Sequence, residues 1–143
     1  MAKAILVLAE QLRGELSDIT FEMLGAGRAL QTVASVLLMV DPRDLGLVAQ
    51  VRSPHDGAPT VYLYEAVPGG VGLAERLWQR HAELVDGAAD LVASCGCDGG
   101  CPSCTGPRPA GGEADLDARA LALRLLGELG AGRVTPSRAP AGR

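Results

Sequence analysis

All four cysteines of the chain lie in the segment Cys95–Cys104, with the spacing C-x-C-x3-C-x2-C. A tetrahedral zinc site needs four thiolates or imidazoles at about 2.0 to 2.3 Å from one ion, so a chain that supplies all four from one short segment must curl back on itself. Gly96, Gly99 and Gly100 permit such a curl because glycine has no Cβ. The spacing therefore predicts a structural zinc site. The predicted ligands are Cys95, Cys97, Cys101 and Cys104.

Other uses of these thiols stay open. Two disulfides would need an oxidising compartment, but no signal peptide is evident, and a bond within Cys95-Gly96-Cys97 would be strained. An iron–sulfur cluster, or a dithiol couple at Cys101 and Cys104, would use the same side chains. The two further cysteines just upstream favour metal over a dithiol couple. We do not expect catalytic zinc, because four cysteines leave no open coordination position.

Charge and hydropathy exclude several classes of protein. Every one of the 13 basic residues except Lys3 is arginine, and no Gly-Lys pair occurs, which excludes a phosphate-binding loop of the G-x-x-x-x-G-K-[ST] type. The net charge of −4 argues against a dedicated nucleic-acid-binding protein. No apolar run reaches the roughly 18 to 20 residues that cross a bilayer. We therefore expect a cytoplasmic protein, and 143 residues suit one modest domain.

The distribution of apolar residues predicts an α+β fold. Ala4–Ala9 is typical of a buried strand, and the apolar spacing over 20–37 predicts a helix despite Gly25 and Gly27. Two β-rich segments, 45–51 and 60–65, flank a stretch of turn residues and predict an antiparallel hairpin.

Helical patterns dominate the second half of the chain. One helix is expected over 73–85, a short helical stretch over 88–93, and another helix over 115–129. The cysteine segment lies between the last two, so we expect a β-hairpin packed against helices and a four-cysteine zinc knuckle between two helices.

Two other features could bind ligands. Gly69, Gly70 and Gly72 precede a predicted helix and could hold a phosphate at its N-terminus, although a lone glycine-rich turn is a weak signal. His81 falls on an apolar helix face, which is more typical of a partly buried histidine than of a metal ligand.

Four segments of the chain carry a combined pattern: Leu38–Gly46, Pro59–Glu65, Pro68–Glu75 and Cys95–Cys104. Together they resemble the C-terminal zinc-binding domain of mitomycin-repair-type DEAD/DEAH-box DNA helicases of superfamily 2. The resemblance covers residues 25–127, and Glu65 stands where that family usually has aspartate.

The resemblance implies a zinc-binding domain over 25–129 and a role for it. The residue patterns predict an N-terminal strand and helix start over 1–24, which could derive from an unrelated family, and the composition predicts a disordered Arg/Pro/Gly tail over 130–143. The family's ATP-driven unwinding in DNA repair does not carry over, because this chain lacks the motor motifs; we expect no enzymatic activity from the chain alone. The implied partners are helicase core domains, in cis or in trans, and DNA through the parent helicase, with no membrane or small-molecule substrate.

Two alternative functions compete with the accessory zinc domain. Residues 1–30 resemble the N-terminus of the electron transfer flavoprotein alpha subunit, so the chain could be a related fragment or a small redox protein. Because that family binds flavin through a domain absent here, no flavin site is implied. The third hypothesis is a protein–protein adaptor that uses the apolar face of 121–129.

Overall fold

The computed structural model describes residues 16–50, 52–54, 57, 60–107 and 117–130. No helix among these residues has both the length and the apolar character needed to cross a membrane. The expected α+β fold is confirmed, with a two-stranded hairpin packed against helices. In chain order the elements are α1 (Leu16–Leu38), the 3-10 turn η1 (Pro42–Asp44), β1 (Leu45–Gln50), β2 (Thr60–Glu65), α2 (Leu73–Gln79), α3 (His81–Ser94) and α4 (Ala118–Gly130).

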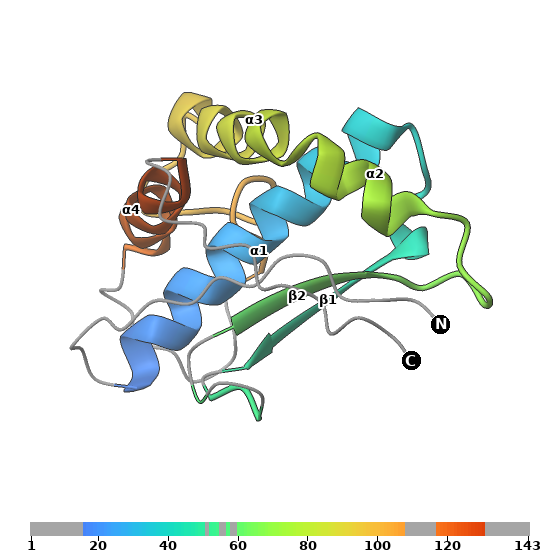
Figure 1. The fold of residues 1–143 in the computed structure, drawn as a ribbon. Coiled ribbons are helices and arrows are strands. Elements are labelled where there is room, and N and C mark those ends of the chain that lie inside the picture. The colour runs from blue at the N-terminus through green and yellow to red at the C-terminus, as the bar shows by residue number, and fades with distance from the viewer. Residues whose placement is uncertain (1–15, 51, 55–56, 58–59, 108–116, 131–143) are drawn as a thin grey trace.

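Helix α1 lies at the centre, between the hairpin on one side and α3 with α4 on the other (Figure 1). Its two glycines are the points of close approach. A Cβ on Gly27 would lie 2.9 Å from Leu47 Cδ1 on β1, and a Cβ on Gly25 would lie 3.4 Å from Ala122 Cβ on α4. The helix predicted over 20–37 is confirmed. Its two glycines allow α4 and the hairpin to pack closely against it from different sides.

A residue in the left-handed region ends helix α1. Met39 has φ +54°, and the Val40 amide donates to the Ser35 carbonyl at 3.0 Å, as in a Schellman motif. Asp41 then caps η1 by accepting from the Arg43 amide at 2.9 Å. These turns aim the chain from the end of α1 into β1.

The hairpin forms as predicted, with Leu45 paired to Glu65 and Gln50 paired to Thr60. Val61 and Leu63 on β2 are buried in the core cluster that also contains the buried side chains of α1. Glu65 is the last residue of β2 and directly precedes the segment with the glycine-rich turn that leads to α2.

One expectation was wrong in its boundaries. The single helix expected over 73–85 is two helices, α2 and α3, which meet at Arg80, and α3 continues through the separate stretch expected over 88–93. Arg80 has φ −114° and ψ 24°, and its guanidinium donates to the Leu37 carbonyl on α1 at 2.9 Å. The apolar residues Leu77 and Leu84 are both buried, so their spacing gives no sign of this break.

Helix α4 agrees with the helix expected over 115–129, of which residues 115 and 116 are not among the described residues. The predicted strand Ala4–Ala9 and nearly all of the predicted tail also fall outside them. Helix α1 crosses the predicted boundary between residues 24 and 25 without a break, and the domain division stays a prediction.

Candidate metal centre

The cysteine loop, residues 95–107, begins where helix α3 ends. Cys95 is the C-cap residue of α3 and has extended backbone angles, φ −68° and ψ 126°, which turn the chain away from the helix axis. The loop lies against the start of α4, since a Cβ on Gly100 would be 3.3 Å from Ala118 Cβ. The structure therefore confirms the four-cysteine segment between two helices.

The four sulfur atoms lie within 4.8 Å of one another. Cys95 Sγ is 3.6 Å from Cys101 Sγ, Cys97 Sγ is 3.6 Å from Cys104 Sγ, and Cys101 Sγ is 3.8 Å from Cys104 Sγ. Four sulfurs bound tetrahedrally to zinc at about 2.3 Å lie about 3.8 Å apart. No disulfide joins any of the four cysteines. They are positioned to bind one metal ion.

Two glycines shape the loop between Cys97 and Cys101. Gly99 has φ +76° and Gly100 has φ +109°, a region that other residues rarely adopt. A Cβ on Gly100 would also lie 2.8 Å from Thr105 Oγ1. These positions require glycine, in agreement with the curl expected from the sequence.

The surroundings of two of the thiols shift their pKa values in opposite directions. Hydrogen bonds from the Ser103 and Cys104 amides lower the pKa of Cys101 to about 6, because they stabilise the thiolate. Burial raises the pKa of Cys97 to about 12. A bound cation would be needed to hold Cys97 as a thiolate at neutral pH.

The dithiol alternative is not favoured by the loop geometry. A redox-active C-x-x-C pair normally lies at a helix N-terminus. Here Cys101 and Cys104 lie in a turn in which the Cys104 and Thr105 amides donate to the Cys101 carbonyl. His81, expected to be a partly buried histidine, is half-buried and stacks on Trp78 with ring centroids 5.2 Å apart.

The glycine-rich turn before α2 already holds an anion, the carboxylate of Glu65. Its Oε1 accepts from the Val71 amide at 2.6 Å, and its Oε2 accepts from the Ala74 amide at 3.3 Å. Burial alone would raise the pKa of Glu65, but these and the neighbouring amides lower it below its ordinary value. The turn that the sequence offered as a weak candidate for phosphate binding is therefore occupied by the chain's own Glu65 carboxylate.

Arg119 is a further residue at the cysteine loop, and the sequence pattern did not point to it. Its Nε donates to the Val92 carbonyl at 3.0 Å and its Nη2 to the Ala93 carbonyl at 2.7 Å, near the end of α3. Its backbone amide donates to the Gly99 carbonyl at 3.3 Å. The acceptors lie 20 or more positions earlier in the chain, so no local spacing could have revealed these contacts.

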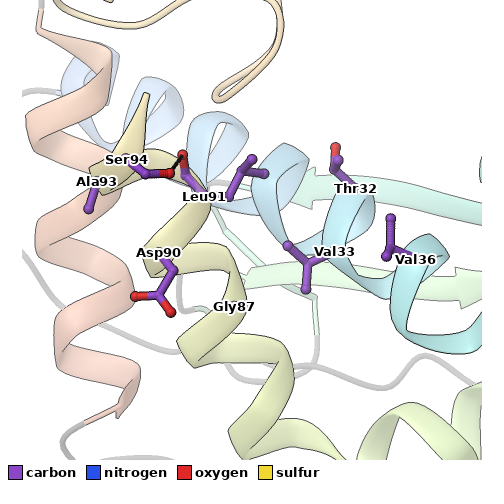
Figure 2. Close-up of a pocket in the computed structure, with 8 residues that line it drawn as sticks. All are labelled: Thr32, Val33, Val36, Gly87, Asp90, Leu91, Ala93 and Ser94. Atoms are coloured by element: carbon purple, nitrogen blue, oxygen red, sulfur yellow. Dashed lines mark hydrogen bonds between the residues drawn. The ribbon is translucent and has the colours of Figure 1, made fainter. Parts of the chain in front are cut away.

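A shallow groove runs between α1 and α3 and extends to Ser94, the residue before the cysteine loop (Figure 2). Val33 and Val36 line it from α1, and Leu91 and Asp90 from α3. The helix face proposed for an adaptor is different. In α4 the side chains of Ala122, Leu125 and Leu126 are buried in the core. The adaptor hypothesis is therefore not favoured.

Comparisons with known proteins agree with this geometry. A family model described as the MrfA Zn-binding domain matches residues 26–105. The crystal structure of the DUF1998 helicase MrfA bound to DNA aligns with a TM-score of 0.72 and 35% identity, over 85% of this chain and 16% of that one.

Two curated proteins are also similar. YprA of Bacillus subtilis (strain 168), an uncharacterized ATP-dependent helicase, is 36% identical over 107 residues, which are 75% of this chain and 14% of the relative. The uncharacterized protein MJ1572.1 of Methanocaldococcus jannaschii is 24% identical over 100 residues, which are 68% of this chain and 89% of that protein. The chain thus spans only 14% to 16% of the helicases. These matches give the flavoprotein resemblance of residues 1–30 no support.

Proposed function

Because this chain belongs to the MrfA Zn-binding domain family, we propose that it acts as a zinc-stapled accessory domain of a DEAD/DEAH-box DNA helicase. Zinc supplies a structural cross-link here, since four thiolates fill its coordination shell. The proposed ligands are Cys95, Cys97, Cys101 and Cys104.

The observation that carries this proposal is the position of the four sulfurs, within 4.8 Å of one another, between the end of α3 and the start of α4. Both helices pack on α1. A metal ion held by the loop would therefore fix the two helices relative to each other and to the centre of the domain. Such a cross-link stabilises a small domain with a limited core.

The proposed partner is a helicase core, and the proposed route to DNA is through that core. The similarity to YprA and to a helicase crystallised with DNA supports this partner. The proposal covers a core contacted in cis as well as one contacted in trans. A role in DNA repair follows from the family resemblance and belongs to the same proposal.

A graft into YprA tests the accessory role. Residues 16–130 of this chain replace the matching segment of YprA, and ATP-dependent duplex unwinding is measured for the graft and for a YprA lacking the segment. We expect the graft to unwind DNA and the deletion to fail. The matched control is the same graft with Cys101→Ser and Cys104→Ser, which should lose both zinc and unwinding. A graft that binds zinc yet unwinds no better than the deletion would contradict the proposal.

A further inference from the structure

The three contacts of Arg119 converge on the frame of the cysteine loop. Val92 and Ala93, whose carbonyls accept from its guanidinium, lie three and two residues before Cys95. Gly99, whose carbonyl accepts from its amide, lies midway between Cys97 and Cys101. Arg119 thus binds the backbone just before Cys95 and also the backbone of the bend between Cys97 and Cys101.

The end of α3 depends on this contact. Helix α3 has no basic residue in its last turn, and the carbonyls of a helix C-terminus carry partial negative charge. Arg119 supplies a cation from another helix, and its two nitrogens bind two successive carbonyls. A planar guanidinium presents two donors in a fixed geometry, whereas a lysine ammonium is a single charged group on a flexible stem.

Helix α4 keeps Arg119 in place. The Asp117 carboxylate accepts from the Ala120 amide at 2.9 Å and so caps the first turn of α4, in which Arg119 lies. The cysteine loop packs against the same turn, since a Cβ on Gly100 would be 3.4 Å from the Arg119 amide nitrogen. The start of α4 is therefore a rigid support for the loop.

We propose that Arg119 is a positioning residue for the metal centre. It presets the backbone on which Cys95, Cys97 and Cys101 are mounted, and so raises zinc affinity without touching the ion. This inference rests on the proposed function, because it takes the four cysteines as zinc ligands. Groups that hydrogen-bond to metal ligands contribute about 10- to 100-fold to metal affinity, and we take the same range as the expectation for Arg119, which acts on the backbone that carries the ligands.

Zinc competition with a chelator tests the proposal in the full chain. We expect Arg119→Gln to weaken zinc binding by about 10- to 100-fold and Arg119→Lys to weaken it less, because lysine keeps the charge but not the fork. The matched control is Arg76→Gln, at an exposed arginine on α2, which should leave the affinity unchanged.

Two further readouts separate positioning from simple packing of α3 on α4. A packing role would lower the urea stability of zinc-loaded and zinc-depleted protein alike, whereas a positioning role lowers that of the loaded form more. Zinc release from loaded protein to a chelator needs no folded metal-free chain, and it should be fastest in Arg119→Gln.

The measurements distinguish a failure of the proposed function from a failure of the role proposed for Arg119. Wild-type protein that binds no zinc would overturn the proposed function and this inference together. Wild-type protein that binds zinc, with Arg119→Gln matching it in affinity and release rate, would overturn the role of Arg119 alone. Equal loss of stability in the loaded and depleted forms would do the same.

Discussion

Glu65 closes the glycine-rich turn by binding the amides that precede and begin α2. Helix α2 has Gly72 as its N-cap, and glycine offers no side chain to satisfy the first amides. The Glu65 carboxylate, 6% exposed at the end of β2, takes that role from outside the helix. The contact of Glu65 with these amides gives the carboxylate at this position a structural role. It also joins the end of β2 to the start of α2.

Substitution of Glu65 by glutamine should destabilise the domain. Glu65→Gln removes the charge that the amides stabilise, and we expect a loss of about 1 to 3 kcal/mol in unfolding free energy at pH 7. Because the folded-state pKa lies below the ordinary value of 4.5, the stabilisation is complete above pH 4.5 and is lost as the pH falls through the folded-state pKa. Urea denaturation of both proteins over a pH series measures this difference.

A surface carboxylate on the same helix provides the control. Glu75 is exposed in the first turn of α2, and Glu75→Gln should change the unfolding free energy by less than about 0.5 kcal/mol. Equal stability of wild type and Glu65→Gln at pH 7, or a difference that grows below pH 4.5, would show that the carboxylate does not clamp the turn.

At the scale of elements, two helix glycines have opposite surroundings. A Cβ on Gly127 in α4 meets no atom within 4 Å, whereas a Cβ on Gly87 in α3 would lie 2.9 Å from Val33 Cγ1 on α1. Gly87 therefore sets how closely α3 approaches α1 beside the groove (Figure 2). Gly127 has no packing role of that kind.

This contrast predicts opposite signs for the same substitution. Gly127→Ala should stabilise the domain by about 0.5 to 1 kcal/mol, because alanine favours the helix. Gly87→Ala gains the same propensity but must displace a stiff β-branched side chain, so we expect a net loss of about 1 kcal/mol. Thermal and urea unfolding of the two variants measure both values. Stabilisation by both substitutions would contradict the close packing of α3 on α1.

The elements that sequence analysis predicted correctly are those specified by local pattern. The hairpin follows from two β-rich segments around a turn, and the helix over 20–37 from its apolar spacing. The break at Arg80 was missed because it depends on a contact with Leu37, far away in the chain, and because the apolar spacing continues across it. Tertiary contacts of this kind leave no periodic signal.

For the whole molecule, the candidate metal ligands could be predicted from a local sequence pattern, whereas the residues that hold the cysteine loop in place could not. The four cysteines could be found because they lie together in Cys95–Cys104, a segment rich in glycine. Arg119 could not, because the partners of its guanidinium belong to a helix that ends before the cysteines begin. Glu65 was noticed through the family resemblance, but its role as an anchor for the turn required the structure.

The decisive measurement is the metal content of the chain, purified without added metal, by elemental analysis, with free thiols counted before and after chelation. We expect one zinc per chain and four thiols that become reactive only when zinc is removed, in keeping with the four clustered sulfurs. Protein without metal, in which two of the thiols undergo a reversible two-electron oxidation, would contradict a zinc-stapled accessory domain and favour the redox alternative.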